Sequence, residues 1–134
     1  MPAPGEVVVR SIVSAISAGT EMLFYRHQLE EGMLLDTAIP SLGGSFAYPF
    51  KYGCATVGRV VDRGSGVPRE LEGRLVFAFH PHESHFSAPA EQLVPVPEDL
   101  SAEEAVMLPS METAVSLAMD GSPLLGEDVL IIGQ

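Results

Sequence analysis

The sequence predicts a mainly β domain with a few short helices, of the α+β class. The chain has 134 residues, of which 46% are hydrophobic and 19% are charged. This length and composition fit one compact domain with an apolar core. Thirteen glycines and eleven prolines interrupt the chain at short intervals. The apolar runs between them are short, which favours strands and turns over long helices.

Four segments before residue 97 have the composition and alternation of strands. They are residues 5–16, 52–64, 75–79 and 86–96. The first is a near-continuous β-branched run that we expect to bend at Ser11. The last is broken by Pro89 and Pro95, because proline cannot donate a hydrogen bond to a neighbouring strand.

Helices are predicted where capping residues precede apolar positions. Residues 21–28 are expected to form a short helix, with Thr20 at its N-cap and Gly32 ending it. Residues 33–50 form a long connection, a length that is typical of functional or mobile loops. Ser101 followed by Glu104 is a capping-box pattern, and Pro109 is expected to separate two helices.

The charge balance bears on partners and location. Eighteen acidic and seven basic residues give a formal net charge of −11, which repels phosphate backbones and anionic lipids, so no nucleic acid or membrane partner is expected. No apolar run is long enough for a membrane span, and the N-terminus lacks a signal peptide. The single cysteine, Cys54, leaves no disulfide framework. These features predict a cytoplasmic domain.

Six segments, in one order, resemble the medium-chain dehydrogenase/reductase superfamily, in particular its zinc-type alcohol dehydrogenase group. The segments are GEVVVR, SAISAGTE, YGCATVGRVVDRGSG, GRLVFAF, LVPVPEDLSAEEAVMLP and VLIIGQ. They span nearly the whole chain, and the last two are the most specific. SAISAGTE and HPHESHF are most similar to a branch that includes bacteriochlorophyllide a dehydrogenase.

The resemblance implies a GroES-like catalytic domain, a partly open β-barrel, over residues 1–126. Residues 127–134 would be the first strand of an NAD(P)-binding Rossmann domain, with Gly133 as the first glycine of its fingerprint. The chain is then truncated before that domain and lacks the first strands of its own domain. NAD or NADP would bind the full-length enzyme but not this chain, which alone is expected to be inactive. The orphan apolar strand at 129–132 is expected to favour self-association.

The implied function is NAD(P)-dependent oxidation of an alcohol, or reduction of a carbonyl or enone, on a small-molecule substrate. The alternative is a catalytically idle GroES-like binding module, or a fragment with no independent activity. An open reading frame that continues with the dinucleotide fingerprint would favour the enzyme.

The resemblance also implies where a catalytic zinc would be held. Ser17 occupies the position of one ligand, Cys54 and Ala55 replace a His-Glu pair, and residues 109–111 contain no cysteine. Serine and methionine are poor zinc ligands, so the chain is predicted to be zinc-independent, with no metal site. Cys54 is then either a small buried hydrophobe or a residue that lines the substrate cleft.

Further candidates carry protons or contact the cofactor. Glu21 and Glu112 are either proton-transfer carboxylates or charges near helix N-termini. Thr20 matches a position near the reacting alcohol and Thr113 one near the nicotinamide, although threonine is also ordinary capping chemistry. His82 is a candidate proton donor. With its neighbours at positions 80 and 85 it could also build a metal site, or lie in a solvated loop.

Overall fold

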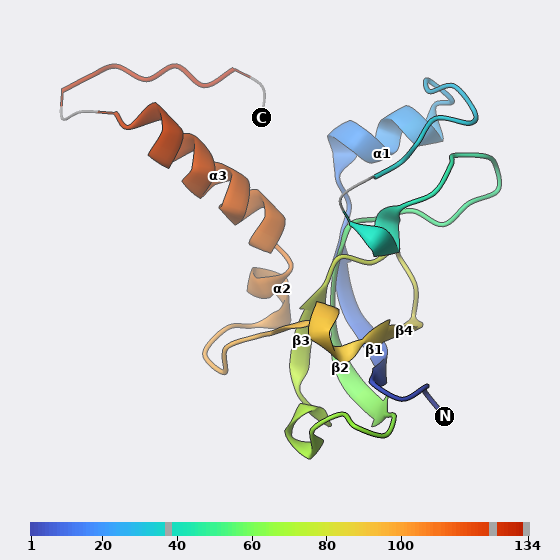
Figure 1. Ribbon diagram of the computed structural model, residues 1–134. Helices are drawn as coiled ribbons and strands as arrows, with labels where there is room; N and C mark the ends of the chain where they lie inside the picture. Colours follow the sequence, from blue (N-terminus) through green and yellow to red (C-terminus); the bar gives the residue numbers. More distant parts are fainter. Residues whose placement is uncertain (37–38, 124–125, 133–134) are drawn as a thin grey trace.

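The computed structural model describes residues 1–36, 39–123 and 126–132. Its body is an antiparallel five-stranded sheet in the order β4-β1-β2-β3-β5 (Figure 1). The strands are β1 (Glu6–Ala15), β2 (Ala55–Arg63), β3 (Leu75–Ala78), β4 (His85–Pro89) and β5 (Val94–Pro95). This open sheet with short helices around it confirms the predicted α+β class and partly open barrel.

Strand β1 lies between β2 and β4 and organises the sheet. It pairs with β2 from Val7 opposite Arg63 to Ala15 opposite Ala55. The register is irregular between Ser11 and Val13, where the sequence predicted a bend. An irregularity of this kind bends a strand and increases its twist.

Two clusters of buried side chains form the core, because successive residues of a strand point to opposite faces of the sheet. The larger cluster joins β1 to β4 and includes Val7, Val9 and Phe86. The second contains Phe77 and Val106 and joins β2 and β3 to the short helix that follows β5. The second cluster therefore attaches the helical segment to the sheet.

Helix α1 (Ala18–Tyr25) begins and ends earlier than predicted. Ser17 is its N-cap residue, so Thr20 lies within the first turn and the N-cap assignment to Thr20 was wrong. The backbone N–H of Ser17 donates to the carboxylate of Glu21 at 2.8 Å, and this bond secures the earlier start. The helix ends before His27, whose φ of 53° is left-handed, so Gly32 does not terminate it.

The predicted capping box is confirmed at α2 (Ala102–Ala105): Glu104 N–H donates to Ser101 Oγ, and Ser101 N–H donates to the Glu104 carboxylate.

Pro109 does not separate the helices as predicted. The break precedes it, and Pro109 lies in the first turn of α3 (Leu108–Gly121). Proline is tolerated there because the first-turn N–H groups have no partner within the helix. Three 3₁₀ turns complete the described elements: η1 (Pro40–Leu42), η2 (Arg69–Leu71) and η3 (Ala90–Gln92).

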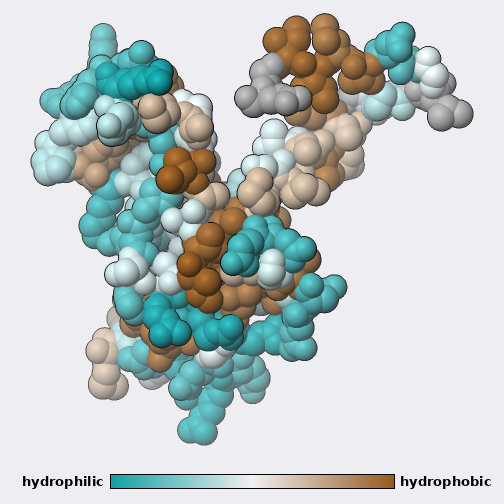
Figure 2. All heavy atoms as spheres, turned by 180° about the vertical axis from the view of Figure 1, so that it is seen from behind, coloured by the Kyte–Doolittle hydropathy of each residue, from teal (hydrophilic) through white to brown (hydrophobic). Residues whose placement is uncertain are grey.

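Helix α3 extends away from the sheet, and the chain turns back after it (Figure 1). Residues 129–132 form no strand, and their side chains are exposed. Figure 2 shows hydrophobic side chains gathered at this projecting end of the molecule. Gly133 lies outside the described residues, so the assignment of 127–134 to a further domain stays a prediction. Within the described part of the chain, no helix is long and apolar enough to cross a membrane.

The exposed apolar segment predicts self-association of the 134-residue chain. Leu130 and Ile132 are 83% and 87% exposed, and contiguous apolar surface of this kind favours association in water. The weight-average mass in sedimentation equilibrium should rise with protein concentration. The double variant Leu130→Glu, Ile132→Glu should restore a monomer. A wild-type chain that stays monomeric at high concentration would contradict this prediction.

Candidate functional site

An aromatic cluster holds the long loop against α1. The ring of Phe24, on α1, lies 5.1 Å from the ring of Phe46, 5.2 Å from that of Phe50 and 4.2 Å from that of Tyr52. The hydroxyl of Tyr48 also donates to the backbone carbonyl of Phe24. Phe46 is fully buried and Phe24 nearly so. This packing fixes the segment just before β2 beside the C-terminal end of α1.

His82 is bonded to two elements that lie far from it in the sequence. Its Nε2 is 3.0 Å from Oε2 of Glu21 on α1, and its Nδ1 is 2.9 Å from Oγ of Ser14 near the end of β1. The other oxygen of Glu21, Oε1, accepts the backbone N–H of Ser17 at 2.8 Å. The side chains of His82 and Glu21 are 30% and 16% exposed. The chain Ser14–His82–Glu21, which we call the Ser–His–Glu chain, is therefore partly shielded and still reachable from solvent.

The backbone before β2 supports the imidazole ring. The N–H of His82 donates to the carbonyl of Tyr52 at 2.9 Å. Gly53 has a φ of +127°, and a Cβ atom built on it would lie 2.8 Å from Cδ2 of His82. Only glycine lets the backbone approach the ring this closely in this conformation. The ring is thus confined on the side of Gly53.

Two further ionisable groups border the Ser–His–Glu chain. Burial raises the pKa of the Cys54 thiol above its ordinary value, and the negative charge of Glu21 raises it further. Burial also raises the pKa of the Tyr52 phenol, with smaller contributions from Cys54, Glu21 and Asp36. Both groups are therefore held in their neutral forms at neutral pH. Cys54 is half-buried and packs against the second core cluster. Its role as a cleft-lining residue stays a prediction.

The raised pKa of Cys54 predicts slow alkylation. Thiolate is the reactive form, so a raised pKa leaves less of it at neutral pH, and reaction with iodoacetamide should be slower than for an unfolded control peptide. Glu21→Gln removes one of the two causes and should speed alkylation at the same pH; burial, the larger cause, remains. Glu91→Gln, at an exposed 3₁₀ turn, is the matched control. Equal rates in wild type and Glu21→Gln would contradict the assigned effect of Glu21 on Cys54.

The rest of the histidine loop forms a separate polar cluster. Glu83 pairs with Lys51, and its carboxylate also lies 3.7 Å from Nδ1 of His80. His85 is exposed, and its ring is 3.5 Å from the hydroxyl of Ser84. Among the residues that the structure describes, no group of three or more histidine, cysteine, aspartate or glutamate side chains is placed to hold a metal ion.

The structure brings together some of the predicted site residues. Glu21 is bonded to His82. Ser17 is bonded to Glu21 through its backbone N–H, and Cys54 is close enough to Glu21 for that charge to raise its pKa. Thr20 is exposed on α1. Glu112 and Thr113 lie on the exposed face of α3, where the Glu112 carboxylate accepts from Ser116 and the Thr113 hydroxyl donates to the carbonyl of Pro109. Their cleft-lining and cofactor roles stay predictions.

Two site residues were not identified from the sequence. Ser14 is an ordinary serine in a strand, and only the fold places it opposite His82. Gly53 carried a signal that could have been used: it lies inside the predicted strand segment 52–64, and a glycine within a strand often marks a close approach of another group.

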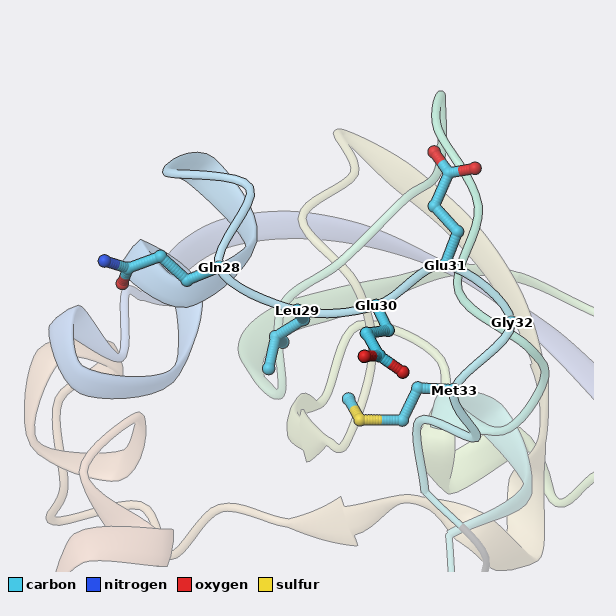
Figure 3. Close-up of a pocket in the computed structure, with 6 residues that line it drawn as sticks. All are labelled: Gln28, Leu29, Glu30, Glu31, Gly32 and Met33. Atoms are coloured by element: carbon cyan, nitrogen blue, oxygen red, sulfur yellow. The ribbon is translucent and has the colours of Figure 1, made fainter.

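The surface is also hollowed away from the Ser–His–Glu chain. One shallow depression is formed by residues 28–33, a single segment after α1. In Figure 3 the side chains of Gln28 and Glu31 point away from it, and Glu30 and Met33 lie next to each other. One local segment without converging polar groups is a poor ligand site. A second groove, between β3 and the start of α2, is bordered by Arg59 and Arg74, whose guanidinium groups bond to Gly73 and Glu98.

No protein-family model and no curated protein matches the sequence. Solved structures do match the fold. A short chain alcohol dehydrogenase from E. coli CFT073, in complex with NADH, aligns over 92% of this chain and 40% of its own, with a TM-score of 0.66 and 19% identity. Escherichia coli quinone oxidoreductase with NADPH aligns over 87% and 33%, with a TM-score of 0.55 and 20% identity. The CurF ER cyclopropanase of the curacin A biosynthetic pathway aligns over 87% and 34%, with a TM-score of 0.61 and 24% identity.

These alignments confirm the predicted resemblance at the level of the fold. The chain has the fold of one part of these dehydrogenases and reductases. It spans 33% to 40% of the length of the three structures.

Proposed function

We propose that this chain, which shares its fold with alcohol dehydrogenases and quinone reductases, is the substrate-side domain of an NAD(P)-dependent medium-chain oxidoreductase. The reaction class is oxidation of an alcohol, or reduction of a carbonyl or enone. The observation that carries the proposal is the Ser–His–Glu chain. It places an imidazole, the side chain best suited to proton transfer near neutral pH, between a carboxylate and a hydroxyl.

The residues of this domain supply the proton that the reaction requires. Reduction of a carbonyl adds a hydride to carbon and a proton to oxygen. His82 can deliver that proton, and the carboxylate of Glu21 at 3.0 Å stabilises the charged ring before delivery. In the direction of alcohol oxidation the same ring accepts the proton. The raised pKa values of Cys54 and Tyr52 make their neutral forms weaker acids at neutral pH.

A nicotinamide cofactor, NAD or NADP, is expected to bind the full-length enzyme and not this chain alone. Of the two positions expected to contact it, Thr113 donates its hydroxyl to a carbonyl within α3, and Gly133 lies outside the described residues. The chemistry that we assign to this chain is therefore limited to the substrate and the proton.

We also propose that the site works without a catalytic zinc. Both ring nitrogens of His82 have hydrogen-bond partners in the Ser–His–Glu chain, so neither is free as a metal ligand. Ser17 and the Pro109–Met111 region offer no strong ligands either. Protein purified without added metal or a histidine tag should contain well under one zinc per chain by elemental analysis. About one zinc per chain, lost on Cys54→Ser, would overturn this prediction.

The proposed activity is tested on the full product of the gene that encodes this chain. A panel of aldehydes, ketones, quinones and enones is offered with NADH or NADPH, and oxidation of the nicotinamide is followed by absorbance. Substrate-dependent oxidation is the expected result. A gene product that binds small carbonyl compounds in calorimetry and turns none of them over would instead be an idle binding module.

A further inference from the structure

The two ring nitrogens of His82 face partners of different chemistry. Nε2 faces Glu21 and Nδ1 faces Ser14, at 3.0 and 2.9 Å. A neutral imidazole has one N–H donor and one acceptor nitrogen, and the distances alone do not say which is which. The partners do.

Glu21 determines the position of the proton. Its Oε1 accepts the backbone N–H of Ser17, which is always a donor, and its Oε2 faces His82. A carboxylate that accepts at both oxygens leaves only the donor role to Nε2. In the neutral ring, Nδ1 is then the acceptor, and the hydroxyl of Ser14 must donate to it.

Ser14 is suited to both protonation states of the ring. A hydroxyl can donate to Nδ1 when the ring is neutral, and it can rotate to accept from Nδ1–H when the ring is charged. Nε2 keeps its proton in both states. The proton that is gained and lost is thus the one on Nδ1, and the only protein group within hydrogen-bond distance of Nδ1 in the described residues is the Ser14 hydroxyl.

We propose that His82 exchanges its proton at Nδ1, with the Ser14 hydroxyl as the relay and Glu21 as the positioning residue. In the delivering direction, the Nδ1–H bond breaks as its proton passes to Ser14 Oγ, and Ser14 gives its own hydroxyl proton to the acceptor oxygen. Ser14 ends as a hydroxyl and His82 as a neutral ring. The relay to substrate rests on the proposed function, whereas the tautomer does not.

The two hydrogen bonds favour this orientation of the ring. A half-turn of the imidazole would exchange Nδ1 with Cδ2 and Nε2 with Cε1, so both hydrogen bonds would be lost. Gly53 packs close to one side of the ring. The bonds hold the ring with Nε2 toward α1 and Nδ1 toward β1.

The tautomer is tested by ¹⁵N NMR of histidine ring nitrogens in the 134-residue chain, at a pH where the His82 ring is neutral. The expected result is a protonated Nε2 and an unprotonated Nδ1. A predominant Nδ1–H form would overturn the proposal. Glu21→Gln should give a mixture of tautomers, because an amide can donate as well as accept. Ser87→Ala, an exposed serine on β4, is the matched control and should leave the His82 signals unchanged.

The relay is tested by turnover of the full gene product. Ser14→Ala should lower kcat about 10²-fold with little change in KM, and Ser14→Thr, which keeps the hydroxyl, should recover most of the loss. Thermal melts of each variant separate this from unfolding. Equal kcat for Ser14→Ala and wild type would overturn the relay. A wild type that shows the expected tautomer but no turnover would instead reject the proposed function and leave the tautomer standing.

Discussion

Gly58→Ala is expected to destabilise the domain by about 1–3 kcal/mol, the range of overpacked core substitutions. A Cβ atom on Gly58 would lie 2.5 Å from the carbonyl oxygen of Arg10 and 2.6 Å from Cγ1 of Val9. Gly58 is in β2, opposite Ser11 on one side and Val76 on the other. Neither neighbouring strand can move away without breaking its own ladder, so the collision is not relieved locally.

Urea denaturation followed by circular dichroism measures this loss as a lower midpoint at unchanged slope. Gly19→Ala is the matched control. Nothing lies within 4 Å of a Cβ built at Gly19, and this residue is in α1, where alanine is favoured over glycine by up to about 1 kcal/mol. Equal stability of Gly58→Ala and wild type would show that β1 and β2 are not paired in the register described above.

The strands were predictable because their signals are local. The β-branched run of residues 5–16 and the alternation of residues 52–64 each identify a strand without knowledge of its partner. The start of α1 was not predictable in the same way. Thr20 and Ser17 are both suitable N-cap residues, and what selects Ser17 is the bond between its N–H and Glu21, which the sequence pattern does not reveal.

The candidate site illustrates the same limit. Glu21 and His82 were each predicted as proton-transfer candidates. They are 61 positions apart in the sequence, and nothing local in either segment indicates that they are in contact. The antiparallel pairing of β1 with both β2 and β4 brings α1 and the histidine loop to the same end of the sheet. Ser14 was missed for this reason: it is distinguished by its position beside that loop and not by any feature of its own segment.

The strand predicted at residues 129–132 was not predictable from its own sequence, because it depends on a neighbouring strand. A short apolar run of four residues satisfies the pattern of a buried parallel strand, but a strand exists only where a neighbour accepts and donates its backbone hydrogen bonds. In the described residues these four have no such neighbour, and their side chains face solvent. Periodicity predicts the potential of a segment to form a strand, whereas the partner decides whether it does.

His82→Gln is expected to lower kcat of the full gene product by about 10²- to 10⁴-fold, the usual contribution of a general acid–base group. Glutamine has an amide of similar reach that can still bond to Glu21 and Ser14, but it cannot take up or release a proton near neutral pH. The loss should therefore appear in kcat, with KM little changed and with the fold intact by circular dichroism.

His85→Gln is the matched control, because it makes the same change three residues away at an exposed ring that contacts only Ser84 among the described hydrogen bonds. It should retain wild-type kcat. The rate of His82→Gln should also depend less on pH than that of the wild type, because glutamine takes up no proton. If both variants lose activity equally, the effect belongs to the loop as a whole. If His82→Gln keeps the wild-type rate and pH profile, the proton in this reaction is carried by a group other than His82.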